Sequence, residues 1–163
     1  MNESLRLSTL TTENQCGDCA LCCKVMSVPE LDKPQNKWCP HAQPGSPCGG
    51  CAIYESRPES CRTFKCAWLM GKFGPSLNMR PDKCKGVVVM TETGWICVYV
   101  DAGFPGAARE GRLGQFVAHM SSLIPVLIVC GNSRSVVARG VAVSKAKAIM
   151  RKGNVELPMY EHA

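Results

Sequence analysis

Gly86-Val-Val-Val-Met-Thr91 and Trp95-Ile-Cys-Val-Tyr-Val100 are two runs of apolar, β-branched and aromatic residues on either side of Glu92-Thr93-Gly94. Runs of this length and composition are typical of strands, and a short connection containing glycine is typical of a β-hairpin. A second pair of runs, Pro125-Val-Leu-Ile-Val-Cys130 and Arg134-Ser-Val-Val-Ala138, is separated by a short turn that begins with glycine. The sequence therefore predicts two antiparallel hairpins in its C-terminal half.

Helical patterns lie between and after these hairpins. The segment from Ala107 to Ser122 has apolar residues at helical spacing and is followed by a proline that ends the pattern; these apolar residues are Leu113, Phe116, Val117 and Met120. Val143 to Lys152 predicts a basic helix. We therefore expect an α+β fold in which antiparallel hairpins pack with one amphipathic helix, as a single domain over residues 1–163 with an α+β scaffold region over residues 84–152.

The distribution of apolar residues predicts no membrane span. The longest apolar run, Ile124 to Cys130, is strand-sized and contains a proline, whereas a spanning helix needs about 20 apolar residues. The first residues, Met1 to Thr12, lack the apolar core and small-residue cleavage site of a secretory signal, so a cytoplasmic location is expected. Disulfides rarely persist there, so cysteines are better explained by metal binding or redox chemistry than by a secreted disulfide framework.

Nine of the twelve cysteines fall between Cys16 and Cys66. From Cys16 to Gly50 the chain is rich in proline and glycine, so it has little apolar surface of its own to bury. A bound metal would supply the missing constraint. We therefore expect residues 16–70 to form a small cysteine-rich metal-binding subdomain with short helices, one around Asp18–Lys24 and a longer one over Ser56–Gly71 that begins with a Ser-x-x-Glu capping box.

Three motifs make this region specific: Cys16-x-x-Cys19-x-x-Cys22-Cys23, Cys39-Pro-His41, and Cys51-x-Ile-Tyr-x-x-Arg-Pro-x-x-Cys61-Arg-x-Phe-x-Cys66. Together they closely resemble the CxxCxxCC family of zinc- or iron-chelating proteins, also called YkgJ-type cysteine-cluster proteins. The match covers Cys16 to Trp68. Flagellin lysine methylases carry a related module but are considerably longer. The resemblance implies eight cysteine ligands here: Cys16, Cys19, Cys22, Cys23, Cys39, Cys51, Cys61 and Cys66.

Eight sulfurs are two sets of four, and the sequence leaves their grouping open. Two tetrahedral zinc sites, two four-cysteine iron–sulfur clusters (4Fe–4S), or one cluster with spare thiols all suit the count. Adjacent Cys22 and Cys23 point in different directions on a regular backbone, so one can serve each site or bridge two metals. Cys48, in Cys48-Gly-Gly-Cys51, and His41 are further candidate ligands whose role the sequence does not decide.

Other residues of the region receive supporting or structural roles. Arg57 and Arg62 flank the cysteines, where they can donate hydrogen bonds to sulfur or offset its charge. Cys84, Cys97 and Cys130 are not expected to be ligands, because a free cysteine in an apolar strand behaves as a small hydrophobic residue and two of them lie in predicted strands.

The leading hypothesis is a metal-binding protein that coordinates zinc or an iron–sulfur cluster through these cysteines. One alternative is an iron–sulfur redox or group-transfer enzyme related to the methylases, although no known catalytic motif nominates an enzyme. Another is a module resembling a zinc ribbon that binds nucleic acid or a protein partner. The formal charge of +6 counts every cysteine as neutral, and aromatic residues are only 6%, so a nucleic-acid partner is disfavoured.

Overall fold

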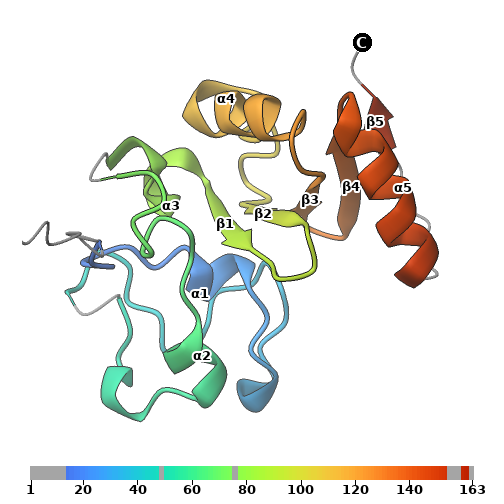
Figure 1. The fold of residues 1–163 in the computed structure, drawn as a ribbon. Coiled ribbons are helices and arrows are strands. Elements are labelled where there is room, and N and C mark those ends of the chain that lie inside the picture. The colour runs from blue at the N-terminus through green and yellow to red at the C-terminus, as the bar shows by residue number, and fades with distance from the viewer. Residues whose placement is uncertain (1–13, 48–49, 75–76, 154–158, 162–163) are drawn as a thin grey trace, which may run out of the picture.

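One mixed sheet organises the molecule (Figure 1). The computed structural model describes residues 14–47, 50–74, 77–153 and 159–161. Within these ranges, five strands pair in the order β1-β2-β3-β4-β5. The strands are β1 (Gly86–Met90), β2 (Ile96–Val100), β3 (Val126–Cys130), β4 (Ser133–Ala138) and β5 (Met159–Glu161). The α+β class expected from the sequence is confirmed.

Both predicted hairpins are present. Strands β1 and β2 pair antiparallel, with Val88 opposite Val98, and β3 and β4 pair antiparallel, with Val126 opposite Val137. The sequence did not predict how the hairpins join: β2 pairs with β3 in parallel, and β4 pairs with β5 in parallel. Parallel neighbours need a crossover connection, and in this chain a helix provides each one.

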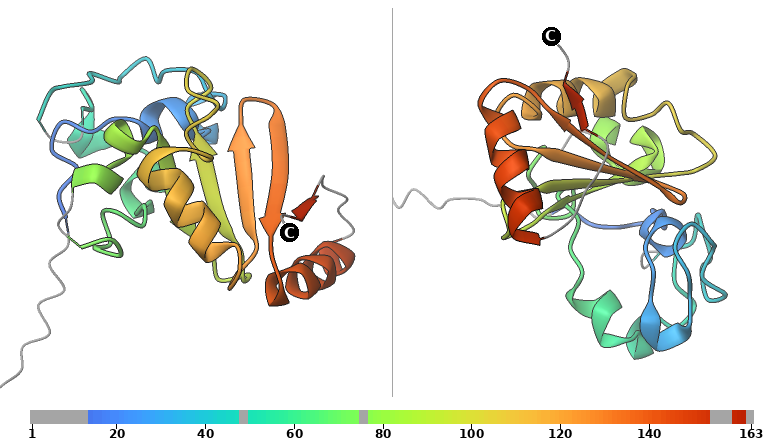
Figure 2. Two further views of the ribbon diagram at one scale, coloured as in Figure 1. Left: turned by 90° about the horizontal axis from the view of Figure 1, so that it is seen from above. Right: turned by 90° about the vertical axis from the view of Figure 1, so that its right-hand side faces the viewer.

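The two crossover helices cover opposite faces of the sheet (Figure 2). Helix α4 (Gly111–Met120) connects β2 to β3, and α5 (Val141–Gly153) connects β4 to β5. Strands β2 and β4 run in opposite directions while the sheet grows towards one edge. Two crossovers of the same hand must then place their helices on opposite faces.

Helix α4 and its face of the sheet enclose the main core. Val88, Val98 and Val126 contribute from three neighbouring strands, and Leu113 and Val117 pack on them from the helix. The predicted amphipathic helix is thereby confirmed, although it is shorter than the pattern over Ala107 to Ser122. Helix α4 also lies very close to β1. A Cβ added at Gly86 would lie only 2.5 Å from Leu113 Cδ2.

The predicted basic helix is confirmed as α5, and one side of this helix also packs on the sheet. Ala142 and Ala146 are fully buried against Val136 and Ala138 of β4. Small side chains on both elements bring the helix close to the sheet, while its lysines and arginines lie on the other side. In the part of the chain that the structure covers, no helix combines the length and apolar content needed to cross a bilayer.

The cysteine-rich segments pack on the face of the sheet opposite α4, at the β1 edge. Leu21, Val25 and Trp68 form a second core with Val87 of β1. Their elements are all short: α1 (Cys22–Val25), η1 (Pro29–Leu31), η2 (Tyr54–Ser56), α2 (Glu59–Thr63), η3 (Leu77–Met79) and α3 (Pro81–Cys84). Since this core is shared with the sheet, the separate cysteine-rich subdomain expected for residues 16–70 is not confirmed.

The helix predicted over Ser56–Gly71 is wrong in length. The residue before a proline is driven to extended geometry, so Arg57 has ψ 145° and α2 begins only at Glu59. The helix ends at Thr63 because the chain then joins the sheet edge, where the Ala67 amide donates to the Val88 carbonyl at 2.8 Å. Cys61 and Cys66 are therefore not constrained by a common helix.

Candidate metal centre

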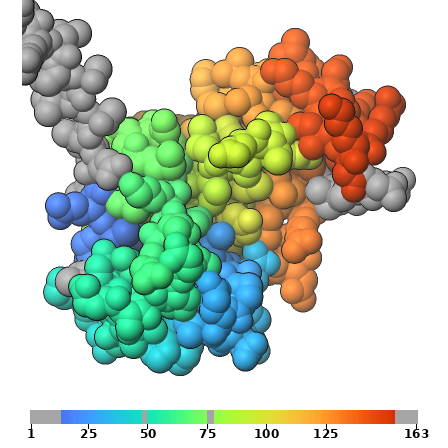
Figure 3. All heavy atoms as spheres, turned by 60° about the horizontal axis from the view of Figure 1, so that its bottom comes forward, coloured from blue at the N-terminus to red at the C-terminus, as the bar shows by residue number. Residues whose placement is uncertain are grey.

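The predicted ligand cysteines come from three segments that meet on one side of the molecule. Cys16 to Cys23 lead into α1, Cys39 follows in the next loop, and Cys51 to Cys66 surround η2 and α2. Figure 3 shows these segments side by side on one face. Each of the eleven cysteines in the described ranges is a free thiol. Cys48 lies outside those ranges.

Backbone hydrogen bonds hold these segments together. The Cys39 amide donates to the Cys23 carbonyl at 2.9 Å, and the Ala42 amide donates to the Cys39 carbonyl at 3.0 Å. Ala42 also pairs with Cys51 as an isolated antiparallel bridge. The Cys19 amide donates to the Cys16 carbonyl at 2.9 Å, which turns the first Cys-x-x-Cys loop. The cysteine backbones are thus fixed by local geometry rather than by long helices.

A capping contact joins the second and third segments. The Glu30 carboxylate accepts hydrogen bonds from the Ser60 amide at 3.1 Å and from the Ser60 hydroxyl at 2.8 Å. It therefore occupies the N-terminal turn of α2, where an acceptor from Ser56 was expected. Position 30 is distant in sequence, which is why the local capping pattern did not indicate it.

The vicinal pair Cys22 and Cys23 lies at the centre of the thiols. Hydrogen bonding between the two side chains raises the pKa of Cys22 and lowers that of Cys23; burial adds to the rise at Cys22. Lys33 and Arg57 further favour the Cys23 thiolate. The two side chains therefore interact with each other rather than facing apart, and Cys23 is the thiol that ionises more readily.

Thiols near this pair include Cys16 and Cys61. Burial raises the pKa of Cys16, and the Cys66 and Cys23 thiols raise it further while Arg57 lowers it. Burial also raises the pKa of Cys61, as do the nearby Cys23 and Cys39 thiols. Cys23 therefore influences the pKa of thiols in the first segment and in the third.

Two cations lie among these thiols. The Lys33 side chain is buried, with the residue only 4% exposed, and its ammonium donates to the carbonyl of Lys24 at 2.8 Å and to that of Met26. Burial lowers the pKa of Lys33, and the Cys23, Cys39, Cys22 and Cys61 thiols counteract this effect. Sequence reasoning missed Lys33, because a lysine in a proline-containing loop carries no pattern that indicates burial.

Arg57 lies where its charge acts on two of the thiols, whereas Arg62 does not contact them. The Arg57 guanidinium stacks on the Tyr54 ring at 3.7 Å, and its Nε is buried without a hydrogen-bond partner among the described residues. It acts electrostatically on Cys16 and Cys23. Arg62 instead pairs with Glu59 on the exposed side of α2.

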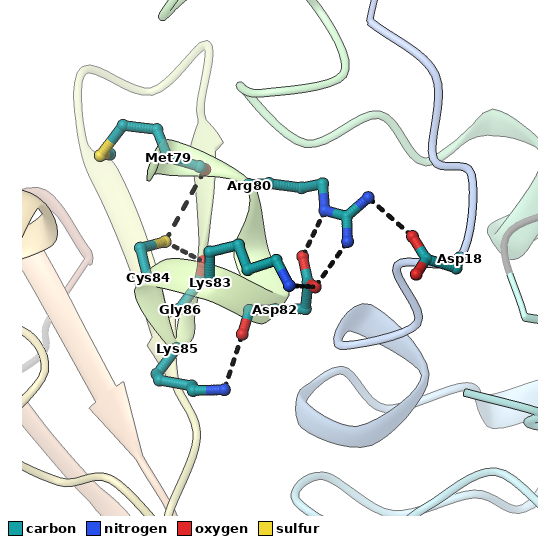
Figure 4. Close-up of polar contacts among 8 residues, drawn as sticks. All are labelled: Asp18, Met79, Arg80, Asp82, Lys83, Cys84, Lys85 and Gly86. Carbon is teal, nitrogen blue, oxygen red and sulfur yellow. Dashed lines mark hydrogen bonds and ion pairs between the residues drawn. The ribbon is translucent and has the colours of Figure 1, made fainter. Parts of the chain in front are cut away.

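Cys19 belongs to a different environment, near Arg80 and Asp82. Figure 4 shows how Arg80 contacts both Asp82 and Asp18, the neighbour of Cys19 in sequence. Arg80 holds Asp82 through Nε at 2.6 Å and Nη2 at 2.7 Å, and reaches Asp18 through Nη1 at 2.7 Å. Burial raises the pKa of Asp82, but Arg80, Lys83 and the Cys19 thiol together hold it below its usual value. Burial raises the pKa of Cys19 to about 11. Arg80 thus ties the loop that carries Cys16 and Cys19 to the scaffold.

The cysteines excluded as ligands lie where the sequence predicted. Cys97 is buried in β2, and Cys130 lies in β3. The Cys84 thiol, at the end of α3, donates to the Gly86 carbonyl at 3.3 Å. Burial raises the pKa of all three thiols, which keeps them neutral.

The cysteine motifs imply a bound metal ion or cluster. Among the described residues, no three histidine, cysteine, aspartate or glutamate side chains are placed to hold one ion. The chemistry of the donors nevertheless fits a thiophilic metal: soft sulfur ligands lie close enough to shift one another's pKa, and two cations are present to offset thiolate charge. Coordination would require these thiols to rotate from their present positions.

Comparison of the chain with protein-family models, with curated proteins and with solved structures found no match. The assignment of ligands therefore depends on the cysteine motifs and on the geometry described above.

Proposed function

We propose that the protein binds a thiophilic metal, as zinc or as a 4Fe–4S cluster, through Cys16, Cys19, Cys22, Cys23, Cys39, Cys51, Cys61 and Cys66. The observation that carries the proposal is the burial of Lys33 beside four of these thiols. A buried ammonium is costly unless negative charge lies close by. The Lys33 ammonium donates to the neutral carbonyl oxygens of Lys24 and Met26, so the compensating charge is assigned to thiolates.

Charge balance supports the same conclusion. Four thiolates around one divalent centre leave two negative charges, and the eight proposed ligands around two such centres leave four, whether the centre is zinc or an iron–sulfur core of equal charge. Lys33 and Arg57 supply two positive charges in the same region. Metal-bound thiols are deprotonated, so a loaded site would supply the counter-charge that these two cations lack among protonated thiols. The free thiols also suit a reducing compartment such as the cytoplasm.

Anaerobic purification followed by metal analysis and ultraviolet–visible spectroscopy tests the proposal. Stoichiometric zinc in a colourless protein, or iron and sulfide in a brown protein with broad visible absorption, would support it and decide between the two metals. Protein that is folded and free of stoichiometric metal, even after anaerobic incubation with zinc or with iron and sulfide, would overturn it.

A matched pair of arginines tests the charge argument. Arg57→Gln should release metal to a chelator about tenfold faster than the native protein, as expected for loss of a group that supports the ligands. Arg62→Gln changes the same side chain on the exposed side of α2, so it should leave the release rate unchanged. Equal rates in both variants would remove the proposed role of Arg57.

A further inference from the structure

A cavity lies between α3, the loop over residues 104–107 and the start of α4, and the one cysteine in its lining is Cys84, which is outside the proposed ligand set. Its volume is about 550 Å³, and its charged and aromatic lining consists of Lys83, Lys85, Phe104, Glu110 and Arg112. It is lined by no proposed metal ligand, so an inference about it is independent of the metal proposal.

Positive charge dominates the cavity. Lys83, Lys85 and Arg112 line it, and Glu110 is the one carboxylate among the lining residues. Lys83 makes a long ion pair with Asp82, at 3.5 Å, and its side chain stays 58% exposed. Arg112 is exposed and makes no ion pair with any described residue. At least two cations are therefore available to an anionic ligand.

An aromatic surface adjoins these cations. Phe104 is 51% exposed, which is unusual for a large apolar side chain, and it lines the cavity together with Pro105, Ala107 and Leu113. The Lys85 ammonium lies 5.0 Å from the centre of the Phe104 ring. A ring exposed beside a charged group can stack on a planar ligand without displacing protein atoms.

The walls of the cavity are fixed by hydrogen bonds. The Phe104 amide donates to the Asp101 carbonyl at 2.8 Å, the Ala107 amide to the Phe104 carbonyl at 3.0 Å, and the Arg109 amide to the Gly106 carbonyl at 2.8 Å. On the opposite wall, Lys85 Nζ donates to the Asp82 carbonyl at 2.7 Å (Figure 4). A site whose walls are already ordered loses little entropy on binding.

We propose that this cavity binds a small ligand that combines a phosphoryl group with a planar apolar part. Lys83 and Arg112 contact the phosphoryl oxygens, and the planar part lies on Phe104. Arginine and lysine are the usual partners of phosphoryl groups, and the cavity volume lies within the range of small-molecule sites.

Titration of the purified full-length protein with phenyl phosphate, followed by calorimetry and by amide NMR shifts, tests the proposal. We expect saturable binding that weakens with added salt, with shifts at Gly106 and Gly111. Inorganic phosphate should bind at least tenfold more weakly, because it lacks the planar part. Absence of saturable binding of phenyl phosphate, or equal affinity for inorganic phosphate, would overturn the proposal.

Three variants locate the binding. Arg112→Gln should weaken phenyl phosphate about tenfold, whereas Arg109→Gln, which removes the same charge from an exposed residue outside the cavity lining, should change affinity less than twofold. Glu110→Gln should tighten binding, because it removes the carboxylate from the lining. A gain of affinity does not arise from misfolding. If Arg109→Gln and Arg112→Gln weaken binding equally, only a general surface charge is present and the proposal fails.

Discussion

The sheet with α4 and α5 and the cysteine-rich segments illustrate two ways of fixing a chain. In the sheet, alternating apolar residues supply buried faces on both sides, and two helices cover them. In residues 14–74, the described helices are three to five residues long, and the second core forms where this region meets Val87 of β1. The first region is held by its own apolar burial, whereas the second depends on contacts with the sheet and, in the proposed function, on a bound metal.

Under the proposed metal binding, the largest expected effect is that of metal loss on the cysteine-rich segments. Removing the metal by chelation, or replacing Cys22 by serine, should speed amide hydrogen exchange across residues 14–74 by orders of magnitude and leave β2 and β3 protected, because structural metal binding supplies folding free energy. Cys130→Ser is the matched control, since that thiol lies in β3 outside the proposed ligand set. Uniform loss of protection over the whole chain would contradict the contrast drawn here.

The next effect concerns the core beneath α4. Leu113 is 1% exposed and packs on the sheet, so Leu113→Ala should lower the free energy of unfolding by about 3 kcal/mol. Leu123→Ala, at a leucine that is 48% exposed, should change it by less than about 0.5 kcal/mol. Urea denaturation measures both values. Because the cysteine-rich segments share a core with β1, they should unfold in the same transition as the sheet.

The ion pair between Lys24 and Asp101 connects the two regions and predicts a dependence on pH. Lys24 Nζ lies 2.6 Å from the Asp101 carboxylate, whose oxygen also accepts from the Gly103 amide at 2.9 Å. Burial raises the pKa of Asp101, but Lys24 and Gly103 outweigh it and hold the pKa below its usual value. The stability from this pair is therefore present above about pH 4 and lost as the pH falls through the lowered pKa.

Asp101→Asn should lower the free energy of unfolding by about 2 kcal/mol at neutral pH and by much less in acid. Glu59→Gln breaks an exposed pair on α2 and should cost less than about 1 kcal/mol. Urea denaturation of both variants at neutral and acidic pH measures how each loss of unfolding free energy depends on pH. An Asp101→Asn variant with the same loss at every pH would show that the carboxylate charge does not join the two regions.

The smallest expected effect is that of Gly114→Ala in α4, where the helix packs closely on the preceding loop. Alanine normally stabilises a helix relative to glycine by about 1 kcal/mol. At position 114 it should instead destabilise by about 1 kcal/mol, because a Cβ there would clash with the carbonyl carbon of Arg109. Gln115→Ala, on the exposed neighbour, should be neutral or slightly stabilising. Thermal unfolding compares the two variants, and a higher melting temperature for Gly114→Ala would contradict the close packing.

Local patterns predicted the sheet region well because its elements are defined by neighbours in sequence. The alternation in 86–91 and 95–100 and the helical spacing of Leu113, Phe116 and Val117 each describe an element that buries one face. The helix predicted over Ser56–Gly71 failed because a long-range contact, between Ala67 and Val88, took the chain into the sheet edge. Propensity is overruled where tertiary hydrogen bonds compete with the helix.

The sequence by itself determined the two hairpins and the helices between and after them, since these follow from spacing along the chain, and its cysteine motifs nominated the candidate ligands through their resemblance to a known family. Only the tertiary structure decided that β2 and β3 pair in parallel, that Lys33 is buried among the thiols, and that Arg80 ties the Cys16–Cys19 loop to α3. These features depend on residues distant in sequence becoming neighbours, and their energies arise from burial and charge that no single segment contains.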